Sequence, residues 1–112
     1  MKRMTLEEKI AQIRHLHSWD IFNEQTLDKE KLTAVVGETG YGFVEGFPLT
    51  GENCRSSMRE IQEYMLTRTR LGIPAFTVAE SLHGSAHEGS TIFPQNIALG
   101  STFNPALAYR RA

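Results

Sequence analysis

The stretch that decides the fold reads Ala75-Phe76-Thr77-Val78-Ala79-Glu80-Ser81-Leu82-His83-Gly84. Its first five residues are largely apolar, which predicts a strand at 75–79 covered on both faces, as in a parallel sheet. A carboxylate, Glu80, follows the strand directly, and a loop containing glycines comes next. Parallel α/β folds place their ligand-binding groups at this end of their strands. The stretch therefore predicts an α/β fold with a binding group at Glu80.

An amphipathic helix is expected before this strand. Its apolar positions are spaced by four, three and four residues: Cys54, Met58, Ile61 and Met65. This pattern predicts a helix of about 18 residues, which Gly72 stops and Pro74 prevents from continuing. A shorter strand is expected at 40–46, between glycines. A strand, a helix and a strand of this length predict a right-handed parallel crossover.

The N-terminal part is expected to begin with a helix. Thr5 and Glu8 have the spacing of a capping box. The apolar residues that follow share one helical face and extend the predicted helix to about residue 17: Leu6, Ile10, Ile13 and Leu16. A loop is expected at 18–26, anchored by Trp19 and Phe22.

Two further helices are expected. Residues 27–36 predict a short helix that ends at Gly37. Asn104 is placed to cap a C-terminal helix with Pro105 in its first turn. This helical pattern still runs at Ala112, the last of the 112 residues, so we expect the native chain to continue. Phe93–Pro94 is a candidate turn. A cis peptide bond is one option there, but X–Pro bonds are mostly trans.

Composition limits the class of protein. A chain of 112 residues with a net charge of −1 allows one domain and shows no basic stripe for nucleic acid and no membrane-binding face. Its single cysteine, Cys54, excludes an intrachain disulfide and is interpreted as a small buried residue. Lys2 and Arg3 are not followed by the apolar stretch of a signal peptide.

The histidines offer a second hypothesis for the site. His83 and His87, with Glu80 and Glu88 nearby, could form a metal cluster. The glycines around them favour a loop over a helix, so His83 is interpreted as a residue that orders the loop and His87 as exposed. His15 and His17 are two positions apart and do not share a helix face, which leaves them no predicted role beyond surface or cap.

Aromatic side chains offer flat apolar surfaces on which a sugar ring could stack. The candidates are Trp19, Tyr41, Phe43 and Phe47. Aromatic residues more often belong to a core, so each is first interpreted as a core residue.

Four segments, in order, resemble the N-terminal barrel domain of glycoside hydrolase family 3, the β-glucosidases and β-xylosidases. They are residues 3–12, residues 70–74, residues 80–95 and residues 98–105. The third segment contains two motifs, Glu80-x-x-His83-Gly84 and Thr91-x-Phe93-Pro94-Gln95. Each segment alone is weak evidence, but their common order makes the resemblance strong.

The resemblance implies that residues 1–112 are the first units of a TIM-type (β/α)₈ barrel, incomplete in this chain and followed by further barrel units and a second α/β domain. It implies a retaining, exo-acting β-glycosidase of carbohydrate catabolism that uses two carboxyl groups and no cofactor or metal. The nucleophile, an Asp on a later strand, and the acid/base further downstream are absent from this chain, which is therefore expected to be inactive alone. Members of the family are often periplasmic or secreted.

The resemblance assigns one residue of this chain to the substrate. Glu80 matches the early carboxylate that holds hydroxyls of the non-reducing-end sugar. Many members have Asp there and Trp where this chain has Phe103, so the choice between glucose and xylose stays open. Two alternatives also stay open: a non-catalytic carbohydrate-binding or assembly module derived from the same barrel, and a metal-dependent hydrolase built on Glu80, His83 and His87.

Overall fold

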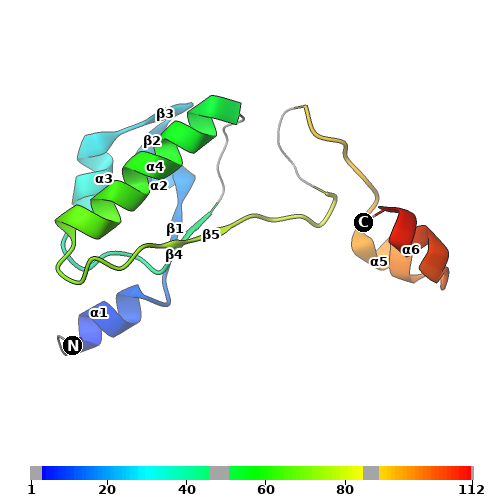
Figure 1. Cartoon of the computed structure of the whole chain (residues 1–112), viewed down its shortest axis with the longest axis horizontal. Coiled ribbons are helices and arrows are strands. Elements are labelled where there is room, and N and C mark those ends of the chain that lie inside the picture. Colours follow the sequence, from blue (N-terminus) through cyan, green and yellow to red (C-terminus); the bar gives the residue numbers. More distant parts are fainter. Residues whose placement is uncertain (1–3, 46–50, 85–88, 112) are drawn as a thin grey trace. The chain divides into compact units, whose positions relative to one another are not determined.

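The computed structural model of the chain describes residues 4–45, 51–84 and 89–111 (Figure 1). They fall into two compact units, one ending at Ala79 and one beginning at Glu80. No helix in these ranges is long and apolar enough to span a membrane.

The first unit is built on a three-stranded parallel sheet. Its strands are β1 (His15–His17), β4 (Phe43–Glu45) and β5 (Phe76–Val78), in the order β1-β4-β5. β4 and β5 are parallel and joined by α4 (Gly51–Arg68), which confirms the predicted strand-helix-strand unit. The chain is thus a mixed α/β protein with a parallel sheet, as expected.

One face of this sheet carries the core. Leu16 of β1 and Val44 of β4 are adjacent in register, and both are fully buried. They pack in one cluster with side chains of α4 and of α3 (Lys29–Val36), two helices that lie beside the sheet in Figure 1. The helical members of the cluster are Leu32, Val36, Ile61 and Met65. Burying each aliphatic side chain contributes about 1.5–3 kcal/mol.

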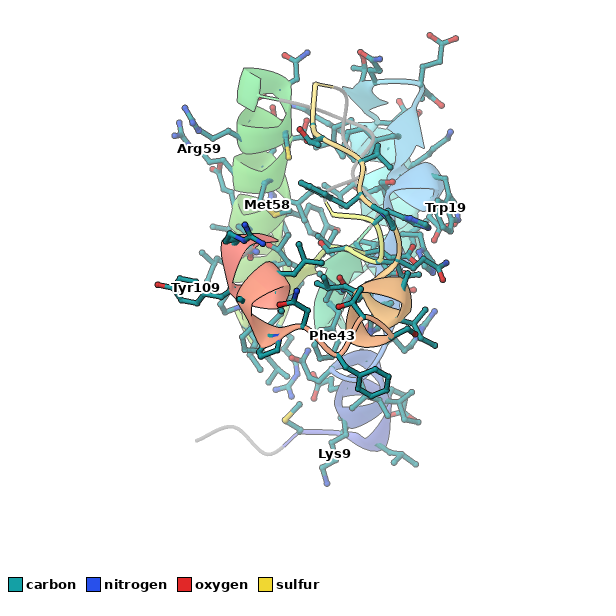
Figure 2. The ribbon with its side chains drawn as sticks, turned by 90° about the vertical axis from the view of Figure 1, so that its right-hand side faces the viewer. Lys9, Trp19, Phe43, Met58, Arg59 and Tyr109 are labelled. Atoms are coloured by element: carbon teal, nitrogen blue, oxygen red, sulfur yellow. The ribbon has the colours of Figure 1, made fainter. Side chains whose placement is uncertain are left out.

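The two helices follow the sequence pattern closely. Ile61 and Met65 of α4 are fully buried and Cys54 packs against the core, as their spacing predicts. Figure 2 shows Met58 on the inner side of α4 and Arg59 on its outer side. In α3, the Asp28 side chain accepts hydrogen bonds from two backbone N–H groups of the first turn, and the helix ends at Gly37 as predicted.

The first helix is much shorter than predicted. The capping box of Thr5 and Glu8 is present, but α1 covers only Leu6–Ala11. Residues 15–17 form β1 instead, because Leu16 gains a fully buried position beside Val44 in the sheet. Tertiary pairing therefore overrides the helical periodicity, and the supposed apolar face is left exposed at Leu6, Ile10 and Ile13.

The segment expected as a loop at 18–26 has its own structure. It forms α2 (Ser18–Ile21) and an antiparallel pair, β2 (Phe22–Asn23) with β3 (Thr26–Leu27). Phe22 is a buried anchor, as predicted. Trp19 is not: its side chain is 67% exposed and projects from the outside of the ribbon (Figure 2). Residues 46–50 lie outside the described ranges.

An ion pair between a buried carboxylate, Glu8, and an exposed guanidinium, Arg70, joins α1 to the segment that leads into β5. The Arg70 guanidinium donates hydrogen bonds to both carboxylate oxygens of Glu8, with Nη2 2.6 Å from Oε2. The backbone N–H of Thr5 donates to the same carboxylate at 2.8 Å. These donors, Arg70 first, lower the pKa of Glu8 to about 2.

Glycine 42 allows α1 to approach the sheet. Its N–H donates to the carbonyl of Ala11 at 3.0 Å. A Cβ at this position would lie 1.8 Å from the carbonyl oxygen of Gln12. Any side chain would therefore push the end of α1 away from β4.

The other face of the sheet is open to solvent at β5. Phe76 of β5 is 73% exposed, so the expectation that this strand is covered on both faces is wrong for the chain as described. The reason is that α3 and α4 both pack against the Leu16 and Val44 side.

The second unit consists of a loop and two short helices, α5 (Asn96–Gly100) and α6 (Pro105–Arg111). The Asn104 side chain accepts a hydrogen bond from the N–H of Leu107 at 3.1 Å, which confirms the predicted cap. α5 was not predicted. Phe93–Pro94 is trans, since no cis peptide bond occurs in the described ranges.

Candidate functional site

Glu80 lies two residues beyond the end of β5 and opens the second unit. The prediction that it follows the carboxyl end of a parallel strand is confirmed. Its side chain is exposed. An exposed carboxylate at this position can accept hydrogen bonds from a ligand's hydroxyls.

The loop after Glu80 is ordered by a pair of hydrogen bonds between His83 and Phe93. His83 Nδ1 donates to the Phe93 carbonyl at 2.9 Å, and the Phe93 N–H donates to the His83 carbonyl at 2.7 Å. The predicted loop-ordering role of His83 is confirmed. Gly84 follows with φ of +83°, and a Cβ there would lie 3.0 Å from the Phe93 ring. Only glycine fits this turn without strain.

The metal hypothesis gains no support. Among the residues that the structure describes, no group of three or more His, Cys, Asp or Glu side chains could hold a metal ion. His87 and Glu88, two members of the proposed cluster, lie outside those residues.

A second polar cluster lies on the face of the sheet opposite the core. On a strand, residues two apart share a face, so His15 and His17 of β1 point the same way. Both rings contact Glu45 of β4: His15 Nδ1 is 2.8 Å from Oε2, and His17 Nδ1 is 2.8 Å from Oε1. The expectation that the two histidines have no common face was wrong, because it assumed a helix.

Aromatic rings flank this cluster on both sides. The His15 ring stacks on Phe43 with centroids 4.8 Å apart, and Phe43 stacks on Phe76 at 5.9 Å. The His17 ring stacks on Trp19 at 4.2 Å, nearly parallel. Figure 2 labels Trp19 and Phe43.

The remaining aromatic candidates do not join this surface. Tyr41 is a buried core residue, and the Arg14 guanidinium covers its ring at 4.5 Å, so it has no free face for a sugar. Phe47 lies outside the described ranges.

Comparison with known proteins settles the family. Residues 5–112 match the Glycosyl hydrolase family 3 N terminal domain. The chain belongs to glycosyl hydrolase family 3. It is 31% identical over 115 residues to a protein of Formosa agariphila named "Putative beta-xylosidase", covering 98% of this chain and 15% of that relative. It is also 31% identical over 104 residues to the "Periplasmic beta-glucosidase" of Salmonella typhimurium, covering 93% and 12%. The chain thus spans less than a sixth of either relative.

In this family 3 chain, the sequence pattern indicated the segment around Glu80 but gave no indication of the cluster of His15, His17 and Glu45. The available signal was the alternation His15-Leu16-His17, polar, apolar, polar, which has the period of a half-buried strand. The overlapping helical pattern through Ile13 and Leu16 hid it. Nothing in the sequence signals that Glu45 lies opposite His17, because strand register depends on the fold.

Proposed function

We propose that this chain is the first part of the barrel domain of a retaining, exo-acting β-glycosidase, which hydrolyses the O-glycosyl bonds of β-linked oligosaccharides or glycosides. The family match over residues 5–112 carries the proposal. The names of the two relatives, a β-xylosidase and a β-glucosidase, support the reaction class.

The sheet is compatible with a (β/α)₈ barrel. Its three parallel strands are neighbours in chain order, and the crossover helix between β4 and β5 packs on one face only. In such a barrel the helices form the outer ring and the other face turns inward. The fold usually takes about 250 residues, so later barrel units and a downstream α/β domain would complete the enzyme.

Glu80 is proposed to bind hydroxyl groups of the sugar at the non-reducing end. Its carboxylate is exposed just beyond a parallel strand, and the loop that follows is held by His83 and Phe93. A carboxylate can accept several hydroxyl hydrogen bonds, and such charge-assisted bonds are stronger than neutral ones.

The catalytic carboxyl pair is proposed to lie outside these residues. A retaining mechanism requires a nucleophile and an acid/base on opposite sides of the glycosidic bond. The chain alone is therefore expected to be inactive.

The test compares the full-length gene product with the 112-residue chain on 4-nitrophenyl β-D-xylopyranoside and β-D-glucopyranoside. We expect turnover by the full-length protein only, and the ratio of kcat/KM for the two substrates identifies the glycone. In the full-length protein, Glu80→Ala should lower kcat/KM at least about a hundredfold, since two charge-assisted hydrogen bonds are lost. Glu63→Ala, an exposed carboxylate on α4, is the matched control.

Two outcomes contradict the proposal. Turnover by the short chain above the buffer control would place the catalytic groups inside it. An unchanged kcat/KM in Glu80→Ala would remove Glu80 from the substrate site.

A further inference from the structure

The open face of the sheet has two rows of side chains in strand register. One row is His15, Phe43 and Phe76, and the row nearer the carboxyl ends of the strands is His17, Glu45 and Val78. Parallel sheets are normally covered on both faces. A face with a carboxylate and two imidazoles is poorly suited to a purely apolar cover, because each buried polar group needs a hydrogen-bond partner.

Glu45 is fixed in orientation while keeping capacity for a ligand. Each of its two oxygens contacts a different imidazole at 2.8 Å, and the side chain is 26% exposed. A carboxylate oxygen has two lone-pair directions, so each oxygen can accept one more hydrogen bond. The central strand, β4, places this group at the carboxyl end of the sheet, where parallel α/β folds bind ligands.

The His17 ring supports the carboxylate from the other side. Its Nδ1 is buried and lies 2.8 Å from Glu45 Oε1. Because this nitrogen faces the carboxylate and is closed to solvent, we expect a sugar hydroxyl to contact Glu45 rather than His17 Nδ1.

Apolar ring surface lies beside these polar groups. Phe43 is two residues before Glu45 on the same strand face, and its ring stacks on the exposed ring of Phe76. Aromatic faces next to a carboxylate suit the apolar C–H surface and the hydroxyl edge of a pyranose. A neutral polyhydroxyl ligand also adds no charge to the Glu45 and histidine cluster.

We infer that Glu45, held between His15 and His17, is a second sugar-binding carboxylate, with Phe43 and Phe76 as the apolar floor beneath the sugar. The inference rests on the proposed function for the identity of the ligand, a pyranose of the β-glycoside class. His15 and His17 are positioning residues that orient the carboxylate.

The test measures sugar binding by calorimetry on the full-length gene product, with D-xylose and D-glucose as probes because these products cannot be hydrolysed. The variants are Glu45→Gln and, as a control, Glu63→Gln on α4. Glu45→Gln keeps the shape of the side chain and removes its charge, so we expect about a tenfold weaker affinity for the preferred sugar, the size of one lost charge-assisted hydrogen bond. Glu63→Gln should bind as the wild type does.

A measurement on the wild type keeps the inference testable if Glu45→Gln fails to fold. The imidazole NMR signals of His15 and His17 should shift when the sugar saturates the protein. Unchanged signals during measurable binding would overturn the inference, as would an affinity within twofold of wild type in a folded Glu45→Gln variant. Absence of binding of either sugar by the wild type would overturn it as well.

The two proposals fail in different ways. A wild-type protein that binds a sugar through Glu45 but hydrolyses neither aryl glycoside would retain this site and refute the glycosidase. If the enzyme is active and Glu45→Gln leaves its sugar affinity unchanged, the proposed glycosidase function stands and the proposed Glu45 site is refuted.

Discussion

The two units of this chain differ in what fixes their side chains. Up to Ala79, a cluster of buried residues from the sheet, α3 and α4 holds the fold together. From Glu80 onward, none of the described residues is buried, and α5 and α6 have only five and seven residues. Glu45 is therefore oriented by a packed sheet, whereas the surroundings of Glu80 depend on loop hydrogen bonds. Of the two proposed sugar-binding carboxylates, Glu45 has the more rigid support.

Two isoleucines test this contrast with the same change of side chain. Ile61 of α4 is fully buried, whereas Ile97 of α5 is 76% exposed. We expect Ile61→Ala to lower the free energy of unfolding by about 2–5 kcal/mol, because it removes buried methyl groups and leaves a cavity. Ile97→Ala should change it by less than about 0.5 kcal/mol. Urea unfolding of the 112-residue chain, followed by circular dichroism, measures both.

Similar losses of stability in Ile61→Ala and Ile97→Ala would contradict this difference between the two units. That result would mean that Ile97 is packed in solution and that the second unit shares a core with the first. A loss at Ile61 alone would sharpen the difference.

The Glu8–Arg70 ion pair predicts how the first unit responds to acid. The folded pKa of Glu8 is about 2, below its ordinary value of 4.5, so the pair stabilises the fold fully above pH 4.5. This stabilisation is lost as the pH falls from about 4.5 to about 2, where the carboxylate becomes protonated. Glu8→Gln should therefore lower the stability at pH 7 and flatten its pH dependence over that window. Urea unfolding at pH 7, 4 and 3 measures the effect.

Glu63→Gln serves as the control for this experiment, because Glu63 is an exposed carboxylate on α4. It should preserve the wild-type acid response. If Glu8→Gln shows the same loss on acidification as the wild type, the ion pair is not what makes the first unit acid-sensitive.

Removing a helix cap is expected to have the smallest effect on stability, and the caps of α1 and α6 allow the two units to be compared. Thr5 caps α1, and Asn104 caps α6. Thr5→Ala should lower the free energy of global unfolding by about 1 kcal/mol. Asn104→Ala should leave global unfolding unchanged and instead speed hydrogen exchange at the amide of Leu107, since α6 opens locally. Equal global losses in both variants would show that α6 unfolds together with the core.

The sequence predicted the elements in which the apolar spacing agrees with the residues that cap or end the element. α4 follows its apolar spacing and ends before Gly72, and α3 lies between the Asp28 cap and Gly37. The strand around Val78 and the cap at Asn104 were also predicted, with bounds a few residues wider than observed. In these segments local preference and tertiary packing favour the same structure.

The misses occur where a non-local contact outweighs a local pattern. β1 has only three residues, and its pairing with β4 buries Leu16 in a position that a helix would not provide. Trp19 was expected in the core, but its ring stacks on His17 at the edge of the sheet. The Glu45 cluster depends on cross-strand register, which no local spacing encodes. The position of Glu80 after a strand was predictable, whereas its role as a sugar ligand stays a prediction.

The strand order has a consequence for how the protein is made. β1, β4 and β5 lie side by side in the order in which they leave the ribosome, and each later strand pairs with the one synthesised before it. A nascent chain can therefore extend its sheet one strand at a time, from the N-terminus, without waiting for a distant segment. Growth from an edge that already exists shortens the time during which a new strand is left unpaired and prone to aggregate.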